Sequence, residues 1–449
     1  MKNFFSKINF NIKVHLNLFN TNIFLFNYEI KVITSYIKSL YLINYINNLE
    51  KKQLLNSLYL IKKKFNLNIE NIHLFIENEI IKFNGDLGNK IYFKKNKNFQ
   101  NIVIKIMLKE EINKINILLI FIRKCIIFLS EKFFDIPLLG LIYINKNIPI
   151  TIGHYLLSWN EMFKRDHDNL LNCKKNCNNL FIDINFLTNY SYNINKHIFK
   201  KILNFKYLTE NYIDSVNNKD YIIFFFFFCN NLIIHLSKIC EDLIFFNNEK
   251  NKFIILSELS IFYNNIIYNK INILELIKSK IGRIYGNSIN ILTILQSQSI
   301  SYNNYQEDKE SLFDNIYTIK SILNYFRIIL PILKFNKRYI YIYMLENYCV
   351  KNDIISYLIK KGLNFENSYL IFKNCEIYCK KNKINFFNIS LKELKSINYL
   401  FQNDIFYYIS IEGSINKNNF YGFTNPKQVI KAIQRAKFFL NNIILKFND

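Results

Sequence analysis

The sequence predicts an all-α protein built around a bundle of long helices. Its 449 residues include only 9 glycines and 4 prolines, so few residues are available to separate short strands. Between Asn272 and Gln296, apolar residues recur every three or four positions, which is the spacing of a buried helix face. Hydrophobic residues make up 50% of the chain, which suits a large core or two to three domains.

Four further segments are expected to form helices. Near the N-terminus, Ile30–Leu49 and Leu54–Phe65 carry isoleucine, leucine and tyrosine at helical spacing. The two most apolar runs are Ile115–Leu129 and Tyr221–Leu236, and polar residues interrupt both. Both are shorter than the roughly twenty residues that a membrane-spanning helix needs, so we expect buried bundle helices and no membrane contact. The first 18 residues contain no uninterrupted apolar run, so no secretory signal is expected.

The formal net charge of +25 raises the question of a nucleic-acid partner. Lysine is spread along the whole chain, and no dense arginine cluster occurs. The chain is also rich in the residues that A/T-rich codons encode, so we interpret the charge as a consequence of composition. A nucleic-acid partner is therefore not expected, although a basic RNA-associated protein stays as an alternative.

The 8 cysteines could form a metal site or disulfides. Cys173 and Cys177 are separated by one helical turn, and so are Cys375 and Cys379. Neither pair has the two-residue spacing or the nearby histidine of a zinc site. We therefore expect no metal and free thiols in a reducing compartment, which predicts a cytoplasmic protein.

A polar block, Tyr302–Glu310, follows the long apolar stretch and would bring many polar groups to one place. Together with the preceding helix, it resembles the central segment of argininosuccinate lyase, a member of the fumarase/aspartase superfamily. The resemblance continues with few gaps over nearly the whole chain. The residues that carry it include Glu275-Leu276-Ile277, Lys280, Gly282-Arg283, Tyr302-Asn303 and Gln306-Glu307-Asp308-Lys309, and elsewhere Pro149–His154, Asn211–Asp220 and Lys431–Lys437.

This resemblance implies the three-domain fold of the superfamily. The expected units are a helical domain at residues 1–94, a central long-helix bundle at 95–339 and a small helical domain at 340–449. It also implies a homotetramer in which several subunits build each active site. The segments Tyr221–Leu236 and Asn272–Gln296 agree with such an assembly, because they are too apolar all round to face water on any side.

The activity that the resemblance implies is the reversible β-elimination of argininosuccinate to fumarate and arginine, the last step of arginine biosynthesis. No metal or organic cofactor takes part in this reaction. Of the family's loop that binds substrate carboxylates, only Asn98 and Gln100 persist here. The substrate-binding residues that the resemblance implies are His73, Asn98, Tyr302, Gln306 and Lys309.

The mobile catalytic loop of the family matches this chain at residues 263–272. Lys270 and Asn272 stand where the family stabilises the negative charge of the intermediate. Asn264 replaces the serine that takes the Cβ proton, and a carboxamide has no useful proton affinity in water. Tyr143 replaces the histidine, and Glu275, the partner of that histidine, is retained. A phenol with a pKa of about 10 can donate a proton but accepts one poorly at neutral pH.

Three functions therefore compete. The first is an active argininosuccinate lyase in which Lys270, Tyr143 or Tyr268 takes over proton transfer. The second is an impaired or inactive family member that keeps the fold and the assembly. The third is the basic RNA-associated protein. The binding residues match the family better than the proton-transfer residues do. We therefore rank the three functions in this order, with little difference between the first and the second.

Overall fold

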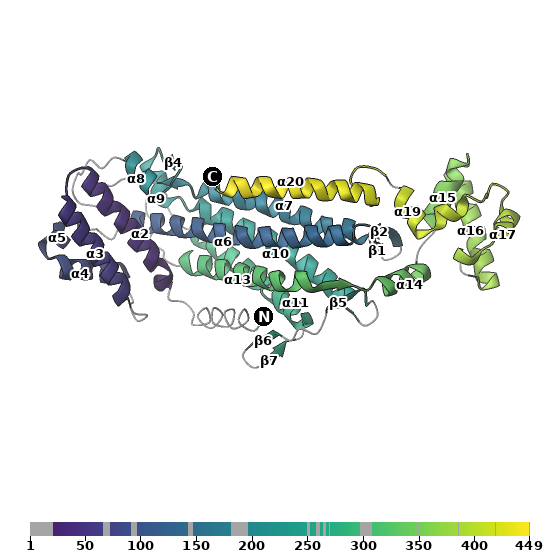
Figure 1. Ribbon diagram of the computed structural model, residues 1–449, viewed down its shortest axis with the longest axis horizontal. Helices are drawn as coiled ribbons and strands as arrows, with labels where there is room; N and C mark the ends of the chain where they lie inside the picture. Colours follow the sequence, from purple (N-terminus) through teal and green to yellow (C-terminus); the bar gives the residue numbers. More distant parts are fainter. Residues whose placement is uncertain are drawn as a thin grey trace.

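The computed structural model describes residues 21–65, 72–90, 97–141, 147–180, 196–248, 252–256, 261–263, 266–268, 270–296, 308–347, 351–384, 386–417 and 419–448. The molecule is elongated and mostly helical, with long helices in the middle and shorter helices at both ends (Figure 1). The prediction of an all-α protein is confirmed. The strands of the described residues are short and form only two-stranded pairs.

The helices at the N-terminal end are α2 (Thr21–Leu42), α3 (Asn48–Lys64), α4 (Ile72–Asn84) and α5 (Asp86–Lys90). The central elements are α6 (Lys97–Lys132), β1 (Pro137–Leu141), β2 (Asn147–Thr151), α7 (Ile152–Asn176), β3 (Asn179–Leu180), α8 (Lys196–Ile202), β4 (Tyr207–Leu208), α9 (Tyr212–Asn217), α10 (Asp220–Phe246), β5 (Ile254–Leu256), β6 (Ile261–Tyr263), β7 (Ile266–Tyr268), α11 (Lys270–Ser279), α12 (Ile281–Gln296), α13 (Asp308–Ile329), η2 (Leu330–Ile332) and β8 (Leu333–Phe335). The last elements are α14 (Lys337–Asn347), α15 (Lys351–Lys360), α16 (Phe365–Asn382), η3 (Phe386–Asn388), α17 (Leu391–Ile397), α18 (Ile405–Ile409), α19 (Ile411–Lys417) and α20 (Pro426–Asn448).

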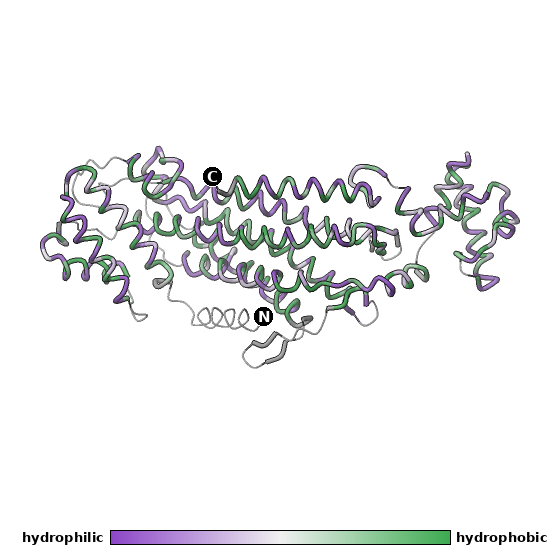
Figure 2. The backbone as a smooth tube through the Cα atoms, viewed as in Figure 1, coloured by the Kyte–Doolittle hydropathy of each residue, from purple (hydrophilic) through white to green (hydrophobic). Residues whose placement is uncertain are grey.

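The central core lies between α6, α7, α10, α12 and α13, which pack along one another. The two most apolar runs of the sequence fall in α6 and α10, as predicted. Hydrophobic residues follow these helices through the middle of the molecule (Figure 2). Among the described helices, α10 is the one whose length and apolar composition would allow it to cross a membrane, and 50% of its most apolar window is buried against other helices. Its packing against four neighbours is that of a core helix.

Two predicted helices have different ends in the structure, where Ile30–Leu49 corresponds to α2 and Leu54–Phe65 corresponds to α3. The expected helix Ile30–Leu49 stops at Leu42, because Asn44 adopts a left-handed conformation with φ of 60°. Asn47 then caps α3, since its side chain accepts a hydrogen bond from the backbone of Glu50 while the Glu50 side chain accepts one from the backbone of Asn47.

The apolar stretch Asn272–Gln296 was expected to form one helix, and the structure divides it into α11 and α12. The break falls at Lys280, whose backbone N–H is shared between the carbonyls of Leu276 and Ile277. Gly282 follows two residues later, and glycine is a weak helix former, which makes an interruption at this point inexpensive.

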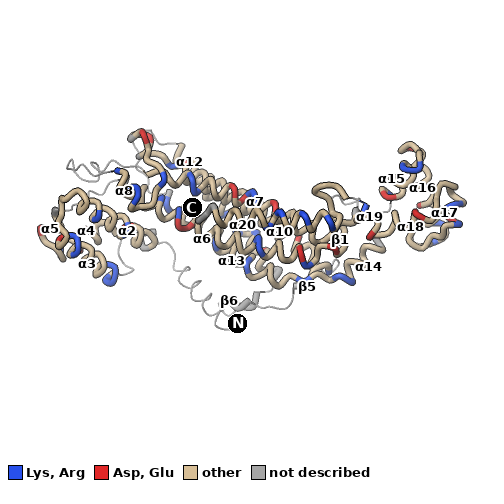
Figure 3. Tube along the Cα trace, turned by 45° about the horizontal axis from the view of Figure 1, so that its top comes forward, with Lys and Arg blue, Asp and Glu red and all other residues tan. Residues whose placement is uncertain are grey.

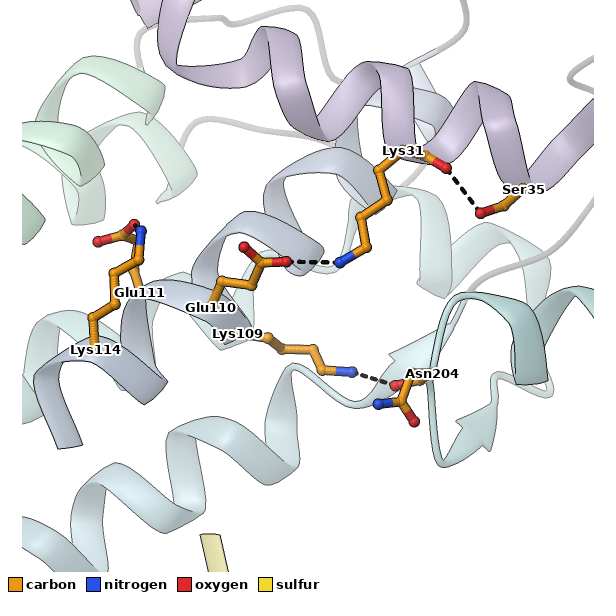
Figure 4. Close-up of polar contacts among 7 residues, drawn as sticks. All are labelled: Lys31, Ser35, Lys109, Glu110, Glu111, Lys114 and Asn204. Carbon is orange, nitrogen blue, oxygen red and sulfur yellow. Dashed lines mark hydrogen bonds and ion pairs between the residues drawn. The ribbon is translucent and has the colours of Figure 1, made fainter. Parts of the chain in front are cut away.

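Polar residues on α6 connect this helix to its surroundings (Figure 4). Glu110 accepts a hydrogen bond of 2.7 Å from Lys31 on α2, and Lys109 donates one of 2.6 Å to the backbone carbonyl of Asn204. The carboxylate of Glu111 is fully buried and accepts from Lys114 at 2.6 Å and from Lys320 of α13 at 2.5 Å. Two lysines therefore balance one buried carboxylate between α6 and α13.

A second buried polar group joins α6 to α7. The guanidinium of Arg123 donates to Asn160 Oδ1 at 3.0 Å and lies 3.0 Å from Nδ1 of His167. Burial, reinforced by the positive charge of Arg123, lowers the pKa of His167 to about 3. Neutral His167 can therefore accept the Arg123 hydrogen bond at Nδ1. Burial also lowers the pKa of Arg123 to about 10, so the guanidinium stays charged at neutral pH.

The last helix, α20, runs back along the central bundle and packs against α6 and α7 (Figure 1). It is amphipathic, and its apolar side closes a small separate core consisting of Ile127, Leu157, Val429, Ile433, Ala436 and Leu440. Lys437 of α20 also pairs with Glu131 of α6 at 2.8 Å.

Gly153, in the first turn of α7, generates a stability prediction. A Cβ at this position would lie 2.6 Å from Cα of Phe134 and 2.8 Å from the carbonyl oxygen of Ser130. Both are backbone atoms that cannot move aside locally, so we expect Gly153→Ala to lower the free energy of unfolding by about 1–3 kcal/mol. The midpoint of urea unfolding checks this, with Ser158→Ala on the exposed side of the same helix as control. An unchanged midpoint in Gly153→Ala would contradict the close contact.

Candidate active site

Side chains from three other parts of the chain contact the first turns of α6. Lys309, at the start of α13, donates a hydrogen bond of 3.1 Å to Oε1 of Gln100. The ring of His73 on α4 lies 5.2 Å from the ring of Phe99. Lys219, which directly precedes α10, donates to Oδ1 of Asn101 at 2.9 Å. This region, called here the α6 end, is therefore a meeting point of α4, α6, α10 and α13.

The electrostatics of the α6 end suit an anionic ligand. The N-terminus of a long helix carries a partial positive charge, because its first backbone N–H groups point along the axis without partners in the helix. Lys309 and Lys219 add two formal positive charges at this point. Helix N-termini supported by cationic side chains commonly bind carboxylates and phosphates.

Three of the predicted substrate-binding residues belong to this region. His73 and Lys309 contact Phe99 and Gln100, and the backbone places Asn98 directly before these two residues in the first turn of α6. Tyr302 and Gln306 lie outside the described residues. The structure thus brings together His73, Asn98 and Lys309, which are far apart in sequence.

A layer of polar contacts between α12 and α13 holds the start of α13 in place. Arg283 of α12 donates to Asp314 of α13 at 2.6 Å, and Nδ2 of Asn287 donates to the same carboxylate at 2.6 Å. One turn further along α12, Asn290 donates to Ser311 at 2.8 Å. These bonds fix the register of the two helices and hence the position of Lys309.

The predicted catalytic residues lie elsewhere. Lys270, Asn272 and Glu275 occupy the first turns of α11, where the described Glu275 side chain is exposed. Asn264 lies outside the described residues, between strands β6 and β7, which pair Tyr263 with Ile266. Tyr143 also lies outside the described residues, in the connection between β1 and β2.

The buried side of α11 fixes its orientation on the bundle. Leu274 and Ile277 are fully buried, and α11 packs against α10, α12 and α13. Lys278 forms an ion pair with Glu241 of α10. Because Leu274 and Ile277 face the core, Glu275 is directed toward solvent in the single chain.

The two groups of predicted residues are separated along the molecule. In Figure 1, α4 lies at the left end, α11 and the β6–β7 pair lie below the middle of the bundle, and β1–β2 lies toward its right end. The structure therefore places His73, Asn98 and Lys309 at the α6 end and leaves α11, β6–β7 and β1–β2 apart from it.

Sequence reasoning missed several groups at the α6 end. The sequence patterns assign no role to Asn101 or Lys219, although Lys219 lies in a segment that resembles the family. Glu29 of α2 was also missed, although it lies 3.8 Å from His73. A charged residue among the buried apolar residues of α2, such as Phe26 and Ile33, was the available signal for Glu29.

No metal centre accompanies these groups in the part of the chain that the structure describes. There, no set of three or more histidine, cysteine, aspartate or glutamate side chains is arranged to hold a metal ion. The described cysteines are free thiols, and burial raises the pKa of Cys173 to about 12.

The long-helix bundle is similar to the fold of known lyases. A family model described as Lyase matches residues 78–264. The crystal structure of EDDS lyase in complex with formate superposes with a TM-score of 0.79 and 17% sequence identity, covering 96% of this chain and 89% of the other. At that identity the likeness shows a shared fold.

Curated relatives narrow this class to one family. Argininosuccinate lyase of Caldicellulosiruptor saccharolyticus is 32% identical over 97% of this chain and 95% of its own length. Argininosuccinate lyase of Ruthia magnifica subsp. Calyptogena magnifica is 30% identical over 83% of this chain and 79% of its own length. The chain belongs to the argininosuccinate lyase family, as the sequence resemblance predicted.

Lys309 allows a test of the α6 end as a ligand site. If Lys309 holds the arginine part of the substrate, as the family resemblance implies, Lys309→Met should weaken the binding of arginine about tenfold, because a charge-assisted hydrogen bond to the α-carboxylate would be lost. Arginine carries a net positive charge, so a purely long-range effect of removing the lysine would strengthen binding instead. Calorimetric titration measures the affinity, and Lys31→Met, which removes a lysine paired with Glu110, is the control. Equal affinity in the parent and Lys309→Met would contradict this assignment.

Proposed function

We propose that the protein is an argininosuccinate lyase, a carbon–nitrogen lyase that splits argininosuccinate reversibly into fumarate and arginine. Membership in the family, across almost the full length of the chain, is the observation that carries this proposal. The α6 end supports it independently, because Lys309, Lys219 and a helix N-terminus form a region suited to the carboxylates of this substrate.

The proposed reaction is a β-elimination. A base removes the proton from the carbon next to a carboxylate of the succinate part, that carboxylate takes up the negative charge, and the C–N bond then breaks. Cations and hydrogen-bond donors directed at this carboxylate stabilise the intermediate. In our assignment, Lys270 and Asn272 supply them at the start of α11. Tyr302, Gln306 and Lys309 hold the arginine part of the substrate, with His73 and Asn98 beside them.

Proton transfer is where this chain departs from its family. Asn264 and Tyr143 occupy the positions of the family serine and histidine, and Glu275 keeps the position of the histidine's partner. We propose that Lys270, Tyr143 or Tyr268 transfers the proton. A positioned base typically contributes about 10²–10⁴-fold to the rate, so turnover slower than in a serine-containing relative is expected.

We further propose that the active enzyme is a cytoplasmic homotetramer. The separation between the α6 end and α11 supports an assembly in which different subunits contribute these elements to one site. The outer faces of the central helices support it too: Phe227 on α10 is 58% exposed, and Ile289 and Leu292 on α12 are 67% and 52% exposed. The domains would be residues 1–94, 95–339 and 340–449.

The two alternatives are less well supported. Family membership favours an active lyase over an inactive relative. Figure 3 shows lysine and arginine on helices throughout the described chain, with aspartate and glutamate among them. Such a spread differs from the single basic stripe of a typical nucleic-acid-binding surface, so it does not favour an RNA-associated protein.

Turnover of argininosuccinate tests the proposed function directly. We expect slow fumarate release by the purified protein, at a rate about 10²–10⁴-fold below that of a relative with the serine. Ultraviolet absorbance of fumarate measures it, and Lys270→Ala, which removes the proposed charge stabilisation, provides the background. If the parent releases no more fumarate than Lys270→Ala, the inactive alternative is correct.

Sedimentation tests the proposed assembly. We expect a particle of four times the chain mass of 54.2 kDa, because single chains would expose the apolar faces of α10 and α12 to water. Equilibrium analytical ultracentrifugation over a range of concentrations measures this mass. A stable particle of one chain mass would rule out the tetramer.

A further inference from the structure

A buried group of titratable side chains lies where α2, α4 and α6 meet, and the proposed mechanism assigns it no task beyond His73. Glu29 of α2 is 6% exposed, and His73 of α4 is 5% exposed. Their closest atoms, Oε2 of Glu29 and Nδ1 of His73, are 3.8 Å apart. Glu77 follows His73 by one turn on α4 and places a second carboxylate near the ring.

Several polar atoms of this group lack hydrogen-bond partners, which is unusual for a group with a purely structural role. In the described part of the chain, Oε2 of Glu29, Nε2 of His73 and Oε1 of Glu77 are buried and have no hydrogen-bond partner. Burial raises the pKa of Glu77, and the adjacent His73 opposes that rise. A buried carboxylate oxygen without a hydrogen-bond partner lowers stability, so packing alone does not account for Glu29.

The position of His73 relates the group to the α6 end. Its ring lies against Phe99, and the next residue, Gln100, accepts the hydrogen bond of Lys309. His73 and Lys309 therefore flank the first turn of α6. The His73 atom without a partner, Nε2, is the ring nitrogen further from Glu29, since the ion-pair contact involves Nδ1.

We propose that Glu29 is a positioning residue for His73, whose Nε2 then binds the carboxylate of the arginine part of the substrate. The Glu29 carboxylate keeps a proton on Nδ1 and orients the ring, because an imidazole N–H is stabilised by a nearby negative charge. A substrate carboxylate that accepts a hydrogen bond from Nε2 completes the arrangement, so that each ring nitrogen faces one carboxylate. This proposal rests on the proposed function for the identity of the substrate.

A set of substitutions tests whether Glu29 acts through His73. The variants are Glu29→Gln, His73→Gln, the double variant and Glu29→Asp, and each is measured for arginine affinity by calorimetry and for KM and kcat with argininosuccinate. We expect Glu29→Gln and His73→Gln each to weaken arginine binding about 10-fold and to raise KM by a similar factor. Glu29→Asp, which keeps the charge, should retain more affinity than Glu29→Gln.

The double variant separates a positioning role from a structural one. Because Glu29 acts only through His73, the double variant should bind arginine as His73→Gln does, within about twofold. If the affinity losses of the two single variants multiply in the double variant, or if Glu29→Gln binds arginine as tightly as the parent, the proposal is overturned. Glu110→Gln, at the neighbouring contact of α2 with α6, is the matched control and should leave affinity unchanged.

The arginine affinities of these variants can be measured whether or not the protein turns over argininosuccinate. If the parent releases no fumarate but binds arginine, and the cycle shows the expected coupling, the proposed function fails while the role of Glu29 stands. If the parent turns over normally and the cycle shows no coupling, the role of Glu29 fails while the function stands. Parent protein that does not bind arginine at all would overturn the role of Glu29. If Glu29→Gln does not fold, His73→Gln remains as the test, and unchanged arginine affinity in that variant would overturn the proposal.

Discussion

The enclosure of α6 is the constraint on which the rest of the structure depends. This helix of 36 residues packs against α2, α7, α13 and α20, so polar groups along its length lie between other helices. Glu110, Glu111 and Arg123 are matched in turn by Lys31, by Lys114 with Lys320, and by Asn160 with His167. Glu111 and Arg123 are fully buried. Since an unmatched buried charge would cost several kcal/mol, the pairings of these two residues restrict how the neighbouring helices can be placed around α6.

The same enclosure gives the candidate site its precision. The first turn of α6 is held by contacts that reach it from α4, α10 and α13, so its backbone donors and nearby lysines keep a fixed arrangement. Groups that are fixed before a ligand arrives need no reorganisation when negative charge is bound. The residues proposed for proton transfer lie on other elements, so the proposed tetramer would have to bring the two parts together.

Sequence patterns predicted what depends on local spacing and missed what depends on tertiary packing. Apolar periodicity located α6 and α10, because burial of one face determines that spacing. It placed no break at Lys280, where only the three-dimensional course of the chain separates two helices. The family resemblance singled out His73 and Lys309, but the contact of Lys309 with Gln100 spans 209 positions, a separation at which spacing carries no information. The sequence marks Glu29 as a charged residue among apolar ones, but its closeness to His73 is visible only in the structure.

The return of α20 along the bundle has a consequence for the order in which the chain can fold during synthesis. The surfaces of α6 and α7 that α20 covers are translated first, whereas the 23 residues of α20 begin at Pro426, long after α7 ends at Asn176. Until then, Ile127 and Leu157 lack the side chains that bury them in the finished protein. A ribosome-bound chain therefore carries an uncovered apolar surface until α20 has been made, and exposed surface of this kind favours aggregation and chaperone binding.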